Sequence, residues 1–200
     1  MLLFAAVLWT HTRAALIALV AALLLLALVR RVWRPAFFAA AVLGSSLAFV
    51  AGYTHFGPRT HFTPAEQRHQ KKIAQENPQQ SNNATSANES SIHEHLVSLW
   101  DGTKSVVKQP WGYGLGNSGV TAVRTNVKVV AGESTYTELG VETGILGALA
   151  FLAWCVLLLR NTLRSRAWLG AAFFAVLVLG LQTDVIGVPW MAVVMWALVA

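Results

Sequence analysis

The residues of this chain that are suited to chemistry gather in a polar stretch, 58–138, between two strongly apolar parts. A glycine run stands out in that stretch, with four glycines in eight positions: Gly112, Gly114, Gly116 and Gly119. Glycine lets a backbone take positive φ values and approach a ligand closely. The run is not a nucleotide-binding fingerprint, because no strand leads into it. A plain flexible loop is the alternative interpretation.

Three titratable side chains of the same stretch could move a proton. His93 and His95 carry the side chain whose ordinary pKa lies nearest to neutrality. Glu133 could serve as a base if desolvation raised its pKa. The alternatives without a catalytic role are that both histidines are exposed loop residues and that Glu133 only caps a helix or places negative charge near a helix N-terminus. The residues by themselves leave both alternatives open.

The elements that must position these residues are apolar runs on both sides of the polar stretch. The chain has 200 residues, of which 55% are hydrophobic and only 12% are charged, against about 25% charged in ordinary soluble domains. Because a helix needs about 20 apolar residues to cross a bilayer, the runs predict an all-α polytopic membrane protein with about five transmembrane helices and one large outer loop. The predicted membrane segments are a partial helix over 1–9 and spans over about 14–29, 36–57, 139–159, 168–181 and 185–200. The last two are short, so a bent re-entrant hairpin is the alternative there.

The chain therefore divides into membrane helices over 1–57, an extracytoplasmic loop over 58–138 and membrane helices over 139–200. Within the loop, residues 63–90 are rich in Gln, Asn and Ser, a composition typical of disorder. Residues 91–109 instead repeat apolar side chains at helical spacing, which predicts an amphipathic helix. That helix would lie on the outer membrane face or pack as an ordinary surface helix on the bundle.

The orientation follows from the short basic loops. The net charge is +6, but six arginines fall in two clusters without any acid, at 30–34 and 160–166. The positive-inside rule places both clusters in the cytoplasm, and the number of spans between them agrees. Arg13, the polar stretch and Asp184 then face the outer side. This charge distribution is a topology signal, and it argues against nucleic acid as a partner.

The first residues look like part of a helix. A signal peptide fits poorly, because no basic residue precedes the apolar stretch and Arg13 interrupts it. Met1–Trp9 resembles the outer half of a helix whose inner half is missing, which indicates the C-terminal part of a longer protein. Farther along, Gly140, Gly144 and Gly147 have the small-residue spacing of close helix contacts.

Three segments of the chain resemble those of a known protein family in their order, their spacing and their side of the membrane. They are Thr-His-Thr-Arg-Ala-Ala at 10–15, the stretch from Trp100 through the glycine run, and the stretch from Glu133 to Gly147. Together they resemble the O-antigen ligase and O-antigen polymerase family of bacterial membrane proteins. Family members usually have more spans, so the first half would be absent here. Many ligases carry a histidine in place of Glu133. A glutamate followed by a serine, as in this chain, resembles the pattern of polymerase-like members.

The resemblance implies a glycosyltransferase of the bacterial inner membrane. It implies transfer of a glycan from a polyprenyl pyrophosphate carrier to an acceptor hydroxyl on the outer face, with neither a cofactor nor a metal. Arg13 and, in second rank, Arg124 are the implied pyrophosphate ligands, because the fork of an arginine can hold two phosphate oxygens. The alternative for Arg13 is a side chain that only extends to the membrane interface. The implied catalytic candidates and loop residues are Glu133, His93, His95, Gly112, Gly114 and Gly116.

Two other hypotheses compete with a transferase. The first is a non-enzymatic membrane subunit or transporter fragment, for which interrupted helices at mid-membrane would be typical; the break at Gln182–Pro189 is the candidate. The second is a truncated, inactive product. The expected partners are a polyprenyl pyrophosphate-linked glycan, the bilayer, and a missing N-terminal half or partner subunit.

Overall fold

The computed structural model describes residues 2–9, 13–56, 64, 68, 90–119, 122, 134–185, 192–193 and 195–197. Within these residues the chain is helical and contains no strand. The helices are α1 (Leu2–Trp9), α2 (Arg13–Arg30), α3 (Arg34–Phe56), α5 (Ser90–Lys108), α7 (Thr135–Ser165) and α8 (Ala167–Leu179).

Three of the described helices are long and apolar enough to cross a membrane: α2, the Arg34–Gly52 part of α3, and α7. Large apolar side chains such as Ile17, Leu28 and Phe37 are exposed on their outer surfaces, where hydrocarbon rather than water is the compatible solvent. The prediction of an all-α membrane protein is therefore confirmed. The apolar helix α8 has 13 residues, too few to span the hydrocarbon core alone.

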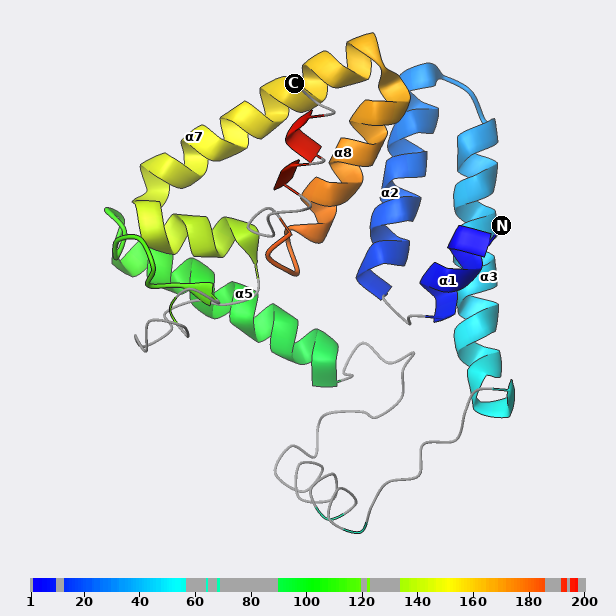
Figure 1. Ribbon diagram of the computed structural model, residues 1–200, viewed down its shortest axis with the longest axis horizontal. Helices are drawn as coiled ribbons and strands as arrows, with labels where there is room; N and C mark the ends of the chain where they lie inside the picture. Colours follow the sequence, from blue (N-terminus) through cyan, green and yellow to red (C-terminus); the bar gives the residue numbers. More distant parts are fainter. Residues whose placement is uncertain are drawn as a thin grey trace.

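The membrane helices lie in the order α3, α2, α8, α7, with α5 crossing one end of α7 (Figure 1). α2 packs on both α3 and α8, and α8 packs on α7. Small buried residues permit these close approaches: a methyl group at Gly170 of α8 would lie 2.7 Å from the side chain of Leu163. The lone cysteine, Cys155, is buried in α7.

An aromatic cluster holds the described C-terminal residues against α7 and α8. Trp196 stacks on Trp154 with ring centroids 4.4 Å apart, and it meets Phe173 of α8 edge-on at 6.0 Å. Met195 is buried against Phe173. Most of the predicted span over 185–200 lies outside the described residues.

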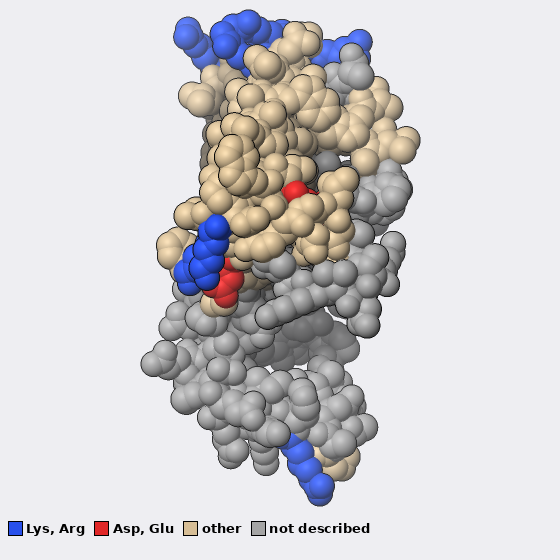
Figure 2. Space-filling view, turned by 90° about the vertical axis from the view of Figure 1, so that its left-hand side faces the viewer, with Lys and Arg blue, Asp and Glu red and all other residues tan. Residues whose placement is uncertain are grey.

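The two short connections, α2 to α3 and α7 to α8, lie at the same end of the molecule (Figure 1). Six arginines lie in these connections or in the helix turns beside them, and we call this end the arginine end: Arg30, Arg31, Arg34, Arg160, Arg164 and Arg166. Figure 2 shows Lys and Arg gathered there. The amphipathic pattern over 91–109 corresponds to α5. The stretch predicted to be disordered, 63–90, lies almost entirely outside the described residues.

Candidate functional site

A break divides α7 into two helical segments. Gly144 has φ 75° and ψ −177°, a conformation open essentially to glycine alone. Residues 135–143 form a short segment that packs on α5, and residues 145–165 form the long segment that runs to the arginine end (Figure 1). The small-residue spacing predicted that Gly144 lies in a helix–helix contact. That prediction is wrong, because Gly144 ends one helical segment and begins the next.

Residues 110–119, which we call the glycine loop, fill the break. The N–H of Tyr113 donates to the carbonyl of Val141 at 2.7 Å, and the N–H of Gly114 donates to the carbonyl of Glu142 at 3.2 Å. On the other side, the N–H of Ile145 donates to the carbonyl of Pro110 at 2.8 Å. A broken helix leaves backbone groups without intrahelical partners, and such groups are costly away from water. The glycine loop supplies those partners.

Two glycines permit this approach. A methyl group at Gly112 would lie 2.6 Å from both the carbonyl oxygen of Glu142 and the nitrogen of Gly144. A methyl group at Gly144 would collide with the carbonyl oxygen of Pro110 and lie 2.7 Å from the carbonyl carbon of Trp111. Backbone atoms cannot turn aside as the tip of a side chain can. The glycine loop and the break in α7 therefore meet at a distance that only glycine on both sides allows.

The carboxylate of Glu142 fastens the loop from the side of the helix. Its Oε1 accepts hydrogen bonds from the N–H of Gly116 at 2.9 Å and from the hydroxyl of Ser118 at 3.0 Å. Gly116 has φ 84°, and a methyl group at Gly119 would collide with the carboxylate of Glu138. A carboxylate in a membrane helix is costly unless protein or water lies beside it. Its partners are the loop itself, and Ser118 carried no signal in the sequence.

The short segment of α7 is clamped to α5 and α8 as well. A methyl group at Gly140 would lie 2.9 Å from Val106 of α5, and one at Gly102 of α5 would lie 2.7 Å from Thr137. The predicted close helix contact is thus present at Gly140. At Gly147 a methyl group would instead meet Thr143 of the same helix.

The start of α7 is bonded to the end of α8. The N–H of Thr135 donates to the carbonyl of Gly180 at 3.0 Å, and the hydroxyl of Ser134 donates to the same carbonyl at 3.2 Å. The hydroxyl of Tyr136 donates to the carbonyl of Leu177 at 2.7 Å. These bonds satisfy carbonyls that α8 leaves open where it ends.

The predicted site residues fall into three groups. Gly112, Gly114 and Gly116 are brought together against the break in α7. Arg13 is the first residue of α2 and is half-buried, and His95 lies in α5 with a buried Nδ1 atom. Arg124 and Glu133 lie outside the described residues, and of His93 only the backbone is described.

The start of α2, helix α5, the break in α7 and the end of α8 share the end of the molecule opposite the arginine end (Figure 1). Arg13, His95, the glycine loop and Asp184 therefore lie at one end. Within the part of the chain that the structure describes, no group of three or more His, Cys, Asp and Glu side chains could hold a metal ion.

Two large apolar side chains of the glycine loop stand out from the surface. Trp111 and Leu115 are each 81% exposed. Trp100 of α5 is also exposed, with the ammonium of Lys104 5.3 Å from its ring centroid. Tryptophan is enriched where protein meets the membrane–water boundary. This edge of the site suits contact with lipid.

No curated protein and no solved structure matches the chain. A family model described as O-antigen ligase matches residues 1–152. That range includes the Arg13 segment, α5, the glycine loop and the break in α7. The match covers more than half of the chain, and the chain therefore belongs to the O-antigen ligase family.

Proposed function

We propose that this protein transfers a glycan from a polyprenyl pyrophosphate carrier to an acceptor hydroxyl at the outer face of the bacterial inner membrane. Family membership and the membrane-spanning helices support this assignment. The positive-inside rule applied to the arginine end supports the sidedness, because it leaves the glycine loop, α5 and Arg13 outside.

The observation that carries the proposal is the glycine loop docked on the break in α7, at the same end as Arg13 and His95. A rigid backbone cradle at the end of the molecule that also carries a cation and an imidazole suits a group transfer in which charge develops on a leaving group. The exposed Trp111 and Leu115 beside it suit a carrier whose polyprenyl chain stays in the bilayer.

In the proposed reaction the acceptor hydroxyl oxygen forms a bond to the anomeric carbon of the glycan. The bond between that carbon and the pyrophosphate oxygen breaks, and the electron pair leaves with the pyrophosphate. Arg13 holds the departing charge, with Arg124 as a second cation. The hydroxyl proton passes to a base, for which His95, His93 and Glu133 are the candidates. No cofactor and no metal takes part in this scheme.

The test replaces Arg13 in cells whose own copy of the gene is deleted. We expect Arg13→Ala to abolish the surface glycan product and to let the polyprenyl-linked donor accumulate. Arg13→Lys should restore only part of the activity, because an ammonium cannot hold two phosphate oxygens in a fork. Arg31→Ala, which removes equal charge at the arginine end, is the control. Normal glycan from Arg13→Ala protein that is inserted at normal levels would refute the role of Arg13.

The products separate ligation from polymerisation. Loss of a ligase leaves the acceptor without any added glycan, whereas loss of a polymerase leaves the acceptor with a single repeat unit. Gel analysis of the acceptor from Arg13→Ala cells therefore assigns the reaction. Glu133 resembles the glutamate of polymerase-like members. We therefore expect the acceptor from Arg13→Ala cells to carry a single repeat unit.

A transporter fragment is the second candidate, because α7 is an interrupted helix and interrupted helices line many transport sites. At this break, however, the carbonyls of Val141 and Glu142 already accept bonds from the glycine loop, so they are engaged rather than open to a solute. Flux of a labelled glycan or ion through liposomes that contain the purified chain would support transport. Lack of flux together with glycan transfer would support the transferase.

A further inference from the structure

The arginine end is rich in positive charge and poor in negative charge. The sequence contains no Asp or Glu over residues 14–65 or over residues 143–183, so the two connections at this end bring arginines together without carboxylates. The ion pair that the structure gives for the described residues, Lys104 with Asp101, lies in α5, away from this end. The guanidinium groups here therefore face lipid, solvent or each other.

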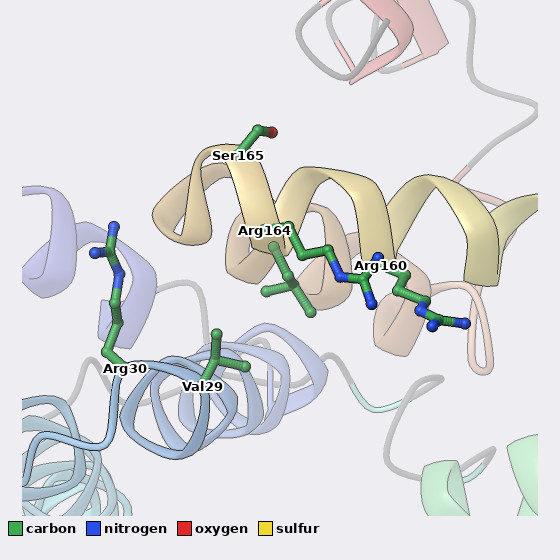
Figure 3. Close-up of a pocket in the computed structure, with 6 residues that line it drawn as sticks. Val29, Arg30, Arg160, Arg164 and Ser165 are labelled. Atoms are coloured by element: carbon green, nitrogen blue, oxygen red, sulfur yellow. The ribbon is translucent and has the colours of Figure 1, made fainter.

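Three of these arginines line one hollow. A pocket of about 490 Å³ lies between the last turn of α2 and the last turns of α7, lined by Val29, Arg30, Arg160, Leu163, Arg164 and Ser165. Figure 3 shows Arg30 on α2 and Arg160 and Arg164 on α7 on the two sides of this opening, with the side chain of Arg30 directed away from the other two. Its volume falls within the range of about 300–1,000 Å³ that is usual for small-molecule sites. We call it the arginine pocket.

The lining suits a phosphate group that carries an apolar tail. Each guanidinium presents a planar fork that matches phosphate oxygens and keeps its charge at any working pH. Val29 and Leu163 add aliphatic surface beside the three charges. A positive-inside topology signal needs only the number of arginines in a loop, whereas here two helices that are far apart in the chain bring their arginines to one cavity.

The position of the pocket along the helices distinguishes a lipid from a soluble anion. Trp33 is 73% exposed and Trp168 is 62% exposed; Trp33 lies within the first arginine cluster, and Trp168 follows the second by two residues. Exposed tryptophans are typical of the depth at which lipid headgroups lie. Basic pockets between membrane helices at this depth are typical sites for anionic headgroups.

We propose that the arginine pocket binds the phosphate of an anionic membrane lipid between Arg30 on α2 and Arg160 and Arg164 on α7. The bound lipid bridges α2 and α7, each of which packs on α8. It adds a contact between these helices at the end of the molecule opposite the glycine loop. This site is separate from the proposed glycan transfer and does not depend on it.

The experiment compares two triple variants of the whole chain in detergent. The pocket variant combines Arg30→Gln, Arg160→Gln and Arg164→Gln. The control variant combines Arg31→Gln, Arg34→Gln and Arg166→Gln, which removes the same charge from the same two connections but spares the pocket lining. Native mass spectrometry then measures binding of phosphatidylglycerol, phosphatidylcholine and inorganic phosphate to each protein, and circular dichroism reports whether each variant is folded.

We expect the native chain and the control variant to retain phosphatidylglycerol in preference to phosphatidylcholine. The pocket variant should bind phosphatidylglycerol about tenfold more weakly or worse, because it loses the positive charge on both sides of the pocket. Equal weakening in both variants would overturn the proposal, since it would mean that only total charge matters. Binding of inorganic phosphate as tight as that of the lipid would overturn the lipid assignment, as would no preference for phosphatidylglycerol by the native chain.

Discussion

The end of the molecule that carries the glycine loop is built from close backbone contacts, whereas the arginine end is built from exposed charge. At the first end, the loop meets the break in α7 at distances that leave no room for a methyl group at Gly112 or Gly144. At the second end, Arg30, Arg160 and Arg164 surround an open hollow. The first end should therefore respond sharply to small changes in shape, and the second should respond to changes in charge.

The largest effect is expected from Gly144→Ala. The new methyl group would strain a backbone that only glycine adopts and would collide with Pro110 and Trp111, each effect contributing about 1–3 kcal/mol. We expect the free energy of unfolding to fall by about 4 kcal/mol, measured by SDS titration in mixed micelles. The matched control is Gly44→Ala in α3, where nothing lies within 4 Å of the new methyl group. That change should stabilise the helix by about 0.5–1 kcal/mol. Equal effects from the two variants would contradict the described break.

A smaller effect separates steric collision from backbone strain within the glycine loop. Gly112 and Gly114 have similar positive φ values, 84° and 93°. A methyl group at Gly112 would meet backbone atoms at 2.6 Å, but one at Gly114 would come no closer than 3.6 Å to Asn117. Gly112→Ala should therefore destabilise the protein by about 1–3 kcal/mol more than Gly114→Ala. Thermal unfolding of the two variants side by side measures the difference, and a difference near zero would mean that the loop is not docked here.

Glu142 tests whether the carboxylate holds the loop in place. Glu142→Ala removes the acceptor of the Gly116 N–H and the Ser118 hydroxyl, and we expect a loss of about 2 kcal/mol. Glu142→Gln keeps one oxygen acceptor and should lose about half of that. Limited proteolysis of residues 110–119 follows the docking of the loop directly. Faster cleavage in the alanine variant than in the glutamine variant is the expected order, and the reverse order would refute this role.

One of the hydrogen bonds between α7 and α8 can be removed by a single substitution. We expect its loss to lower the free energy of unfolding by about 1 kcal/mol. Tyr136→Phe removes the hydroxyl that donates to the carbonyl of Leu177 at 2.7 Å. Tyr113→Phe is the control, because the hydroxyl of Tyr113 makes no hydrogen bond to another described residue. Chemical denaturation of both variants should show a shift for Tyr136→Phe alone. A shift of the same size for Tyr113→Phe would remove the argument for a specific clamp.

The smallest effect on stability is expected at the arginine end. Arg34→Gln and Arg166→Gln change exposed residues outside the arginine pocket and should alter the free energy of unfolding by less than about 0.5 kcal/mol. The same SDS titration measures this change. A loss above 1 kcal/mol from either variant would show that the arginine end depends on specific contacts, and the contrast between the two ends would fail.

Several features of the fold could be predicted from local sequence. The apolar runs indicated α2, α3 and the long segment of α7, because hydropathy adds up residue by residue along a helix. The spacing of Leu96, Leu99 and Trp100 indicated α5, because a 3.6-residue period is also a local property. The glycine run was recognisable from its composition, but composition alone left a plain flexible loop as the alternative to a binding loop.

Other features could not be predicted in this way. Gly140 and Gly144 belong to the same small-residue pattern, yet Gly140 packs against α5 while Gly144 breaks the helix. Nothing near Gly144 in the chain distinguishes the two roles. The difference arises because Pro110 and its neighbours come from a distant part of the chain and satisfy the backbone groups that the break exposes.

The sequence by itself therefore determined the membrane class, the run of helices, the two arginine clusters and the resemblance to O-antigen ligases, all of which depend on residues close together in the chain. Only the tertiary structure decided which glycine breaks α7, which groups hold the carboxylate of Glu142, and that Arg30 lines one pocket with Arg160 and Arg164. The physical reason is that hydropathy and charge act at the level of single segments. Hydrogen-bond partners and cavities require two segments to meet, and that depends on how the whole chain packs.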